Sequence, residues 1–483
     1  MRAARLALAG ALLAVGGCAP SPQERGTLAL AECRLPGLER AARCGSHEVW
    51  EDRDAGKGRR IAIKVAVIPA RRRGAEPDPI VILAGGPGQG AIALASQVAP
   101  LFSRLNDSRD IVLVDQRGTG GSNPLDCEPD DGAGLQSVFE DALPEKVVSQ
   151  CLEEIEADPR HYATPTAVAD LDEVLGALGY ARVNLWGGSY GTRVALEFMR
   201  RHPQRVRTAT LDGVAPAGMK LPLSFVTDGE AAFERLVADC EAESGCGKAF
   251  PGLRRDLSAL RSRLARQPAR VEISDPVTGE PQEVRVTESV FLSGLFRPLY
   301  APEISSLLPL AVARAAGGDF NPLLAQNLEF TEALADNLAV GMHLSVVCSE
   351  DVPRITQADL ATASRSFFGR ALVDDFLRAC RLWPRASVPA DYFDPVRSEA
   401  PVLILSGGID PATPPRYGEA VLAGLPNARH AIAPNLSHGV SGHGCAPRLI
   451  EKFVRGADAK ALDARCLERI PRPLFVLPAG ARP

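Results

Sequence analysis

Residues 187–191 read Gly-Gly-Ser-Tyr-Gly and join two segments of different pattern. The preceding residues, 182–186, form a short apolar run typical of a buried strand, whereas residues 192–200 have the spacing of an amphipathic helix. A Gly-x-Ser-x-Gly pentapeptide between a strand and a helix predicts a strained turn, because glycine permits the backbone angles that present the serine hydroxyl. The turn therefore predicts a nucleophile at Ser189. A serine that caps a helix after an ordinary strand-to-helix turn would have the same pattern. Residues elsewhere in the chain must therefore distinguish a nucleophile from a capping residue.

Short apolar runs alternate with helical patterns through the first half of the chain, and two more such runs lie near its end. This alternation is typical of an α/β fold, in which helices flank a mostly parallel sheet. The expected strands span residues 61–69, 80–84, 110–115, 183–186, 206–211, 401–406 and 429–433. Between the third and fourth of them, we expect Thr164 to cap a helix that has Pro165 at its first position.

A long helical segment, residues 217–400, interrupts this alternation. It is rich in alanine, leucine and arginine, and only residues 270–286 alternate enough to predict a small hairpin. A segment of roughly 180 residues is too long for a loop, so it must pack as a lid or cap. We therefore expect a mainly helical cap, inserted after the sixth strand of a core that comprises residues 30–216 and 401–483.

The composition of the 483 residues is that of an ordinary globular protein. A net charge of −5 and an isoelectric point near 5.9 leave no strongly basic face, so we expect no nucleic-acid partner. Beyond residue 20, no apolar run approaches the roughly 18 residues that a membrane-spanning helix requires. The sequence leaves the oligomeric state open.

The N-terminal segment, residues 1–18, has the features of a lipoprotein-type export signal. Basic residues precede an apolar run over residues 6–15, and a site of small residues follows. Residues 15–18, Val-Gly-Gly-Cys, resemble a bacterial lipobox, whose cysteine is lipidated and begins the mature protein; ordinary cleavage near Ala19 is the alternative. Either route predicts an exported protein of the bacterial cell envelope, which is either periplasmic or anchored to a membrane through a lipid on Cys18.

The other ten of the 11 cysteines form five pairs of near neighbours along the sequence. An even number of cysteines in an exported chain predicts disulfides. The simplest pairing joins Cys33 to Cys44, Cys127 to Cys151, Cys240 to Cys246, Cys348 to Cys380, and Cys445 to Cys466. The sequence has no Cys-x-x-Cys or Cys-x-x-His cluster, so it does not indicate a metal site. The export signal and the absence of an unpaired thiol in this pairing disfavour a catalytic cysteine.

A histidine and an acid that could activate Ser189 follow the insertion. A serine hydroxyl becomes an effective nucleophile when an imidazole takes its proton, and a carboxylate orients that imidazole. In α/β hydrolases these residues occur in the order serine, acid, histidine. Asp410 follows the expected strand 401–406 and His438 follows the strand 429–433, so the order is present.

Both assignments have an alternative. Asp212 lies at the end of the strand before the insertion, and an acid displaced by one strand could still reach the histidine. His443 lies in the same loop as His438 but farther from the end of the strand. We expect Asp410 and His438 to act with Ser189.

The reaction also requires N–H groups that stabilise the oxyanion. In this fold they come from the residue after the nucleophile and from a loop after an early strand. Tyr190 supplies the first backbone N–H, and Gly86 in the loop 84–88 supplies the second. A phosphate-binding loop is not indicated, because no Gly-Lys-Ser or Gly-Lys-Thr follows the glycines.

These motifs resemble those of the serine peptidase family that contains proline iminopeptidases and tripeptidyl aminopeptidases. The blocks that carry the resemblance are residues 85–88 (Gly-Gly-Pro-Gly), 115–122 (Asp-Gln-Arg-Gly-Thr-Gly-Gly-Ser), 187–191, 407–414 and 438–440, with Cys445 beyond. The last two blocks are similar to the tripeptidyl aminopeptidase branch. The resemblance implies an α/β hydrolase with a cap over its site, which hydrolyses amide bonds next to a free peptide amino terminus and needs no cofactor.

The resemblance also implies how a substrate ammonium is held. Members of the family bind it with acidic residues of the cap, and Glu350 and Asp351 are the best candidates. Asp228 and Glu230 are the alternatives. The glycine loop begins with Ala84 where proline iminopeptidases commonly have histidine, so the sequence does not indicate strict prolyl specificity.

Three functions are compatible with the sequence. The favoured one is an exported serine aminopeptidase, of tripeptidyl or prolyl type, that acts on peptides with a free N-terminus. A carboxylic-ester hydrolase would use the same triad, because both reactions pass through an acyl-enzyme. A non-catalytic binding lipoprotein of the same fold is disfavoured by the complete triad.

Overall fold

The computed structural model describes residues 27–127, 135–139, 143–275, 278–335 and 338–480. Cys18 and the expected signal segment lie outside these residues. Within the described chain, no helix has the length and apolar character needed to cross a membrane.

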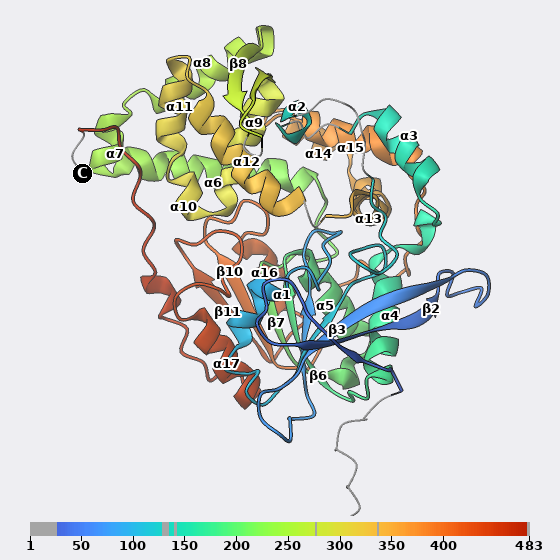
Figure 1. The fold of residues 1–483 in the computed structure, drawn as a ribbon. Helices are drawn as coiled ribbons and strands as arrows, with labels where there is room; N and C mark the ends of the chain where they lie inside the picture. The colour runs from blue at the N-terminus through green and yellow to red at the C-terminus, as the bar shows by residue number, and fades with distance from the viewer. Residues whose placement is uncertain (1–26, 128–134, 140–142, 276–277, 336–337, 481–483) are drawn as a thin grey trace, which may run out of the picture.

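A nine-stranded sheet forms the centre of the lower half of the molecule (Figure 1), in the order β1-β2-β3-β5-β4-β6-β7-β10-β11. The first four strands in this order pair antiparallel, and all pairs from β5 onward are parallel. The strands are β1 (Ala31–Cys33), β2 (Ala42–Trp50), β3 (Arg60–Ile68), β4 (Ile80–Leu83), β5 (Ile111–Val114), β6 (Val183–Gly188), β7 (Val206–Asp212), β10 (Val402–Gly407) and β11 (Ala428–Ala433).

Helices cover both faces of this sheet, and the strand sequences show why. In β4, Val81 and Leu83 belong to one buried apolar cluster, whereas Ile80 and Ile82 belong to another on the opposite face. The first face packs on α4 (Thr164–Ala177), α5 (Tyr190–Arg201) and α16 (Pro415–Leu422), and the second on α1 (Ala95–Val98) and α17 (Ala446–Gly456). This is the expected α/β fold.

The insertion follows the seventh strand along the chain, so its expected position after the sixth strand is wrong. β1 and β2 precede the five strands whose ranges the sequence predicts before the insertion. β1 contains only three residues. β2 carries the polar side chains of Ser46, His47 and Glu48 among its apolar ones, because it lies near the edge of the sheet and is only partly buried. Neither strand therefore has the apolar pattern that marks the central strands.

The residues between β7 and β10 are mainly helical and lie above the sheet in Figure 1. They form α6 (Leu223–Ala242), α7 (Ser244–Ala249), α8 (Leu253–Arg266), α9 (Glu288–Phe296), α10 (Pro302–Ser305), α11 (Leu308–Ala316), α12 (Asn321–Ala335), α13 (Val340–Val346), α14 (Gln357–Ala363) and α15 (Ala371–Leu382), with a hairpin of β8 (Ala269–Ser274) and β9 (Pro281–Val286). The expected hairpin is thus present. We call this insertion the cap.

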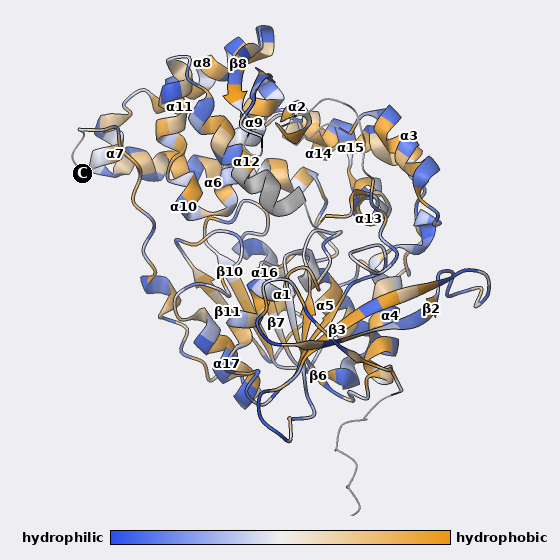
Figure 2. Ribbon diagram, viewed as in Figure 1, coloured by the Kyte–Doolittle hydropathy of each residue, from blue (hydrophilic) through white to orange (hydrophobic). Residues whose placement is uncertain are grey.

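The cap has an apolar core of its own. Side chains of α6, α8, α9, α11 and α12 form one buried cluster, and the short helix α2 (Leu135–Phe139) joins it. Hydrophilic and hydrophobic residues alternate along these helices in Figure 2, as expected for helices with one buried face. The later part of the cap is different, because Met342, Val346 and Cys348 pack in the cluster that includes α4 and α5. The cap is therefore attached to the core through α13 and its continuation.

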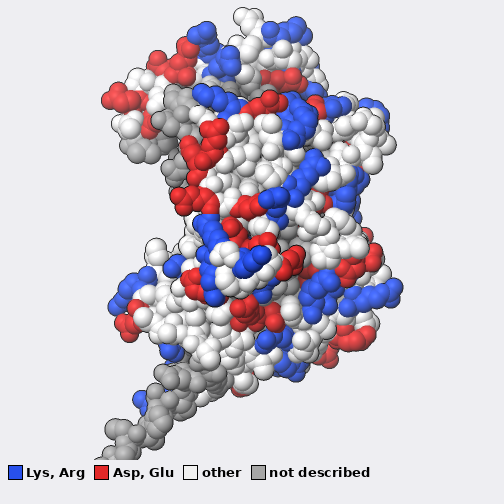
Figure 3. Space-filling model, turned by 90° about the vertical axis from the view of Figure 1, so that its right-hand side faces the viewer, with Lys and Arg blue, Asp and Glu red and all other residues white. Residues whose placement is uncertain are grey.

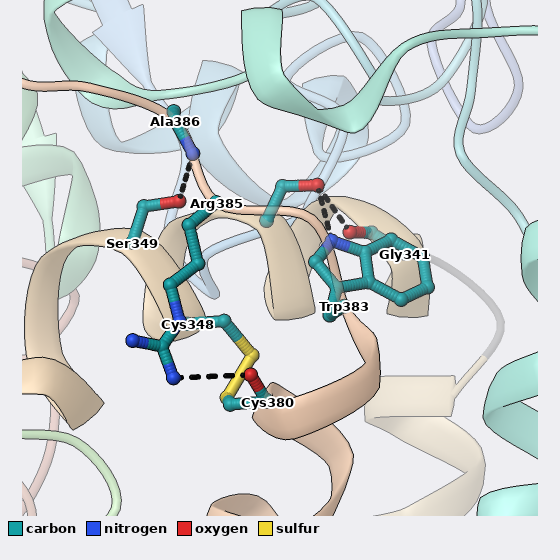
Figure 4. The surroundings of a disulfide bond; sticks show 8 residues. Gly341, Cys348, Ser349, Cys380, Trp383, Arg385 and Ala386 are labelled. Carbon is teal, nitrogen blue, oxygen red and sulfur yellow. Dashed lines mark hydrogen bonds between the residues drawn. A yellow bond between two sulfur atoms is a disulfide. The ribbon is translucent and has the colours of Figure 1, made fainter.

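All five predicted disulfides are present. Cys33–Cys44 joins β1 to β2, and Cys348–Cys380 joins the segment after α13 to α15. Figure 4 shows the surroundings of the second bond, where Ser349 Oγ accepts a hydrogen bond from the N–H of Ala386 at 2.9 Å. The helix α3 (Glu145–Glu154) is held to residue 127 in the same way through Cys151.

The surface carries charges of both signs. On the face seen in Figure 3, acidic and basic side chains are interspersed, and the cap and the core meet at a narrower waist. The C-terminal residues run from the core to the cap, on the left of Figure 1. There Phe475 packs in the apolar core of the cap.

Candidate active site

Ser189 lies in the sharp turn between β6 and α5 and has φ 54° and ψ −124°. This is a strained backbone conformation for a residue with a side chain. The glycines on both sides are required by close packing. A Cβ at Gly191 would lie 2.1 Å from the carbonyl oxygen of Leu83, and one at Gly187 would lie 2.5 Å from that of Gly191. The turn thus has the geometry that the pentapeptide predicts.

His438 and Asp410 contact each other at the carboxyl ends of β11 and β10. The Nδ1 atom of His438 lies 2.9 Å from Oδ2 of Asp410. The other carboxylate oxygen of Asp410 accepts hydrogen bonds from the N–H groups of Ala412 and Thr413, both at 2.8 Å. The Asp410 side chain has no exposed surface, whereas 18% of the His438 side chain is exposed.

The charges of this pair favour each other's ionised form. Burial opposes ionisation of Asp410, but the His438 imidazole and the two backbone N–H groups outweigh it and hold the pKa of Asp410 below its ordinary value. Burial also opposes ionisation of His438 and lowers its pKa. The charge of Asp410 and the hydrogen bond to it have a larger, opposite effect, so the pKa of His438 lies above its ordinary value. Such a pair can stabilise an imidazolium that forms during a reaction.

The alternative residues have other partners. The Asp212 carboxylate accepts hydrogen bonds from the N–H groups of Val440 at 2.8 Å and Ser441 at 2.7 Å, and burial raises its pKa. Asp212 therefore holds the loop of His438 and does not bind its imidazole. His443 lies five residues farther along this loop and is not on the wall of the cavity that contains His438.

A cavity of about 310 Å³ lies between the ends of the strands and the cap. Ser189, Tyr190 and His438 line it from the core, and Gly86 lines it from the loop after β4. The cap contributes mainly apolar side chains to the wall, among them Met219, Leu221, Phe225, Tyr300 and Leu338. The structure thus brings four sequence-predicted site residues to one cavity.

The loop after β4 is held by the cap. A Cβ at Gly85 would lie 3.4 Å from Cβ of Ser189, so the loop runs beside the nucleophile. His343 of α13 lines the cavity, and its Nδ1 lies 3.0 Å from the carbonyl oxygen of Pro87. The next carbonyl, of Gly88, accepts a hydrogen bond from the N–H of Ala339 at 3.0 Å.

No pattern in the sequence indicates this role for His343. Its partner is a backbone carbonyl 256 residues away, and no side-chain motif reports such a contact. Because a carbonyl only accepts, Nδ1 must carry the proton. Burial lowers the pKa of His343, so the neutral ring is favoured.

The structure does not bring Glu350 and Asp351, the residues expected to bind the substrate ammonium, to the cavity of Ser189. Both carboxylates are fully buried, and neither lines the cavity. Arg193 donates to both, at 3.2 Å and 3.1 Å. Burial raises the pKa of each carboxyl group, although the Arg193 charge opposes the rise.

Thr164 completes this cluster instead of capping α4. The N-cap residue of α4 is Ala163, and Thr164 donates its backbone N–H to Glu350 at 2.8 Å. Its hydroxyl contacts Tyr190 and the same carboxylate. The prediction that Thr164 caps the N-terminus of α4 is therefore wrong, because the buried Glu350 carboxylate binds the Thr164 side chain instead.

Asp228 and Glu230, the alternative candidates for binding the substrate ammonium, form hydrogen bonds or ion pairs with other residues of the chain. Asp228 pairs with Arg416 at 2.7 Å and accepts a hydrogen bond from Tyr417, and Glu230 accepts one from the N–H of Phe367. Neither residue lines the cavity. Among the described residues, no group of histidine, cysteine and acidic side chains could hold a metal ion.

The block 115–122 has a supporting role. The Asp115 carboxylate accepts hydrogen bonds from the N–H groups of Ile92 at 2.8 Å and Gly121 at 2.9 Å. Arg117 is fully buried and forms a bidentate pair with Asp170 of α4. The block therefore fastens the loop after β5 to α4 and to Ile92, which lies just beyond residues 84–88. We call residues 84–88, which contain Gly86, the oxyanion loop.

Family comparisons agree with this geometry. Residues 78–246 match the family model of the α/β hydrolase fold. The chain is an α/β hydrolase. Residues 365–466 of this hydrolase also match the family of TAP-like proteins, and this match includes the positions of Asp410 and His438.

Three relatives of the hydrolase are peptidases by name. The serine protease Hip1 of Mycobacterium tuberculosis is 24% identical over 514 residues, which cover 96% of both chains. A tripeptidyl aminopeptidase of Streptomyces lividans is 26% identical over 41% of the hydrolase and 40% of its own length. A proline iminopeptidase of Neisseria gonorrhoeae is 29% identical over 29% of the hydrolase and 34% of its own length. The predicted relationship to this peptidase family is confirmed.

Proposed function

We propose that the protein is a serine aminopeptidase-type hydrolase, which cleaves amide bonds near the free N-terminus of peptides. The observation that carries the proposal is the His438–Asp410 pair on the wall of the cavity that also contains the strained turn of Ser189. The names of the relatives support peptides as the substrates. The chemistry needs no cofactor.

In the proposed mechanism, Ser189 Oγ attacks the carbonyl carbon of the scissile bond while Nε2 of His438 takes its proton. Asp410 keeps the proton on Nδ1 and stabilises the imidazolium. The N–H groups of Tyr190 and Gly86 stabilise the oxyanion of the tetrahedral intermediate. His438 then protonates the leaving amine, and water releases the acyl group by the reverse steps.

The deciding experiment compares substrates with and without a free amine. Wild type and Ser189→Ala are assayed on free and N-acetylated mono-, di- and tripeptide substrates and on short acyl esters. We expect wild type to cleave the free-amine peptides fastest, and we expect Ser189→Ala to lose activity by at least ~10³-fold. His443→Ala is the matched control, because it removes a histidine of the same loop that does not line the cavity.

The other outcomes each contradict a part of the proposal. Equal cleavage of acetylated peptides would exclude recognition of the free amine. Turnover of esters alone would favour the carboxylic-ester hydrolase, and full activity of Ser189→Ala would exclude the triad.

We also propose export to the cell envelope, with a lipid anchor on Cys18. The five disulfides support this location, because they form and persist in oxidising compartments. Fractionation of wild type and Cys18→Ser tests the anchor: the wild type is expected with the membranes, and the variant in the soluble fraction. Recovery of both in the soluble fraction would contradict it.

A further inference from the structure

A second pocket lies within the cap, beside the cavity of Ser189. It has a volume of about 100 Å³ and is formed by residues of α6, α9 and α15 and by Phe368. The α9 residues on its wall are Ser289, Leu292, Ser293 and Phe296, which recur at the spacing of one helical face. We call it the distal pocket.

The lining of the distal pocket is mostly apolar and includes three polar residues, Ser289, Ser293 and Asp375. Asp375 pairs with Arg378 on the same helix. Phe225, Val226, Phe368 and Leu372 surround the α9 face. Ser293 Oγ is buried in this wall, and it forms no hydrogen bond with any residue that the structure describes. A buried hydroxyl without a partner costs free energy, which a ligand with a polar atom beside its apolar part could recover.

The distal pocket adjoins the catalytic cavity at one side chain, Phe225, which lines both. A series of ring contacts runs from this side chain to the catalytic histidine. Ring centroids lie 5.9 Å apart for Phe225 and Phe296, 5.7 Å for Phe296 and Tyr300, and 5.1 Å for Tyr300 and His438. Gly229 of α6 makes room for this series, because a Cβ there would lie 2.5 Å from the Phe296 ring.

The position of His438 determines which part of a substrate lies beside this series of aromatic rings. In the proposed mechanism His438 protonates the leaving amine, so the leaving group must lie beside its imidazole. Tyr300 contacts the same imidazole, and the rings beyond it lead to the distal pocket. The acyl side of the substrate lies instead toward Ser189 and the oxyanion loop.

We propose that the distal pocket binds an apolar side chain of the substrate on the leaving-group side of the scissile bond. This inference rests on the proposed peptidase function. It assigns the selectivity for the residue after the cleavage point to α9 and α15. A large apolar side chain there gains roughly 10- to 100-fold in kcat/KM over glycine, as expected for a pocket that accepts several methylene-sized groups.

The test compares peptides that share their acyl residues and carry glycine, leucine or phenylalanine after the cleaved bond, with products identified by mass spectrometry. Ala371→Trp fills the pocket from an exposed position on α15, and Leu292→Trp fills it from α9. We expect both variants to lose the preference for phenylalanine over glycine, measured as the ratio of the two kcat/KM values. Leu382→Trp is the matched control, since Leu382 is on α15, 40% exposed and outside the pocket.

A second measurement separates this inference from the proposed function. The acyl-enzyme formed from p-nitrophenyl acetate loses its acetyl group to water or to an added amine, which gives acetic acid or an N-acetyl amide and regenerates the Ser189 hydroxyl. Phenylalanine amide is expected to compete with water more effectively than glycine amide in wild type but not in Ala371→Trp. This holds even if no peptide is cleaved, in which case the proposed function alone fails.

Three results would overturn the inference. In the first, wild type cleaves the three peptides equally and partitions equally between the two amides. In the second, both filled variants keep the preference for phenylalanine and have native melting temperatures. In the third, the filled variants change only the preference for the residue before the cleaved bond.

Discussion

At the scale of single residues, the site depends on which acid binds the histidine. Asp410 and Asp212 are both buried at the ends of neighbouring strands, but only Asp410 is within hydrogen-bonding distance of Nδ1 of His438. A carboxylate in this position fixes the tautomer that can accept a proton at Nε2. The assignment therefore has consequences for rate and for pH dependence.

We expect Asp410→Asn to lower kcat by about 10³- to 10⁴-fold, the range that loss of a triad acid gives in other serine hydrolases. The pH profile provides a second readout. In wild type, kcat/KM rises as His438 loses its proton, at a pH above the ordinary histidine value, because Asp410 raises the pKa. Removing the Asp410 charge lowers that pKa, so the acid limb of the residual activity shifts to lower pH.

Asp212→Asn is the comparison variant. It removes the charge that accepts the hydrogen bonds of Val440 and Ser441, so we expect a loss of stability and a smaller loss of kcat. The acid limb should shift less than in Asp410→Asn, because the Asp212 charge raises the pKa of His438 without a hydrogen bond to the imidazole. Measurement of kcat/KM from pH 5 to 9 for both variants checks this. The assignment would be reversed if Asp212→Asn alone moved the limb.

At the scale of elements, α13 links the cap to the oxyanion loop. His343 and Ala339 bind the carbonyl oxygens of Pro87 and Gly88, the two residues that directly follow Gly86. We expect His343→Ala to lower kcat by roughly 10- to 100-fold with little change in KM, because a misplaced oxyanion donor weakens transition-state binding more than substrate binding. His343→Gln retains a side-chain N–H donor and should recover part of the rate.

Steady-state kinetics and thermal melting of both variants test this link. A fall in melting temperature with an unchanged kcat would show that His343 acts on stability alone. A rise in KM with an unchanged kcat would place it in substrate binding instead.

The same scale shows what the sequence could and could not predict. The central strands and the chain order of Ser189, Asp410 and His438 follow from local pattern, since buried parallel strands are short apolar runs and their ends carry the site. β1 and β2 were missed because an edge strand need not be apolar. The burial of Glu350 depends on Arg193, Thr164 and Tyr392, which are far apart in sequence, so no local pattern could reveal it.

At the scale of the whole molecule, the C-terminal arm fastens the cap to the core. Beyond Cys466, which is bonded to Cys445 of the core, the chain reaches the cap, where Arg472 pairs with Asp239 and Phe475 enters the apolar cluster. Val476 donates its N–H to the carbonyl of Ser306 at 3.2 Å. The arm thus resists separation of the two parts.

We expect Phe475→Ala to lower the free energy of unfolding of the cap by about 3 kcal/mol, the low end of the range for buried phenylalanine. Leu474→Ala is the matched control, because Leu474 is 83% exposed and should change stability by less than about 0.5 kcal/mol. Urea unfolding and limited proteolysis of the cap measure the effect. Equal behaviour of the two variants would show that the arm does not hold the cap.

Asp212 has a consequence for motion during turnover. Its carbonyl oxygen accepts the N–H of Ser189 at 2.9 Å, while its carboxylate holds the N–H groups of Val440 and Ser441. One aspartate of the core therefore contacts both the turn of Ser189 and the loop of His438. A displacement of either segment relative to the other must break a hydrogen bond to this one residue.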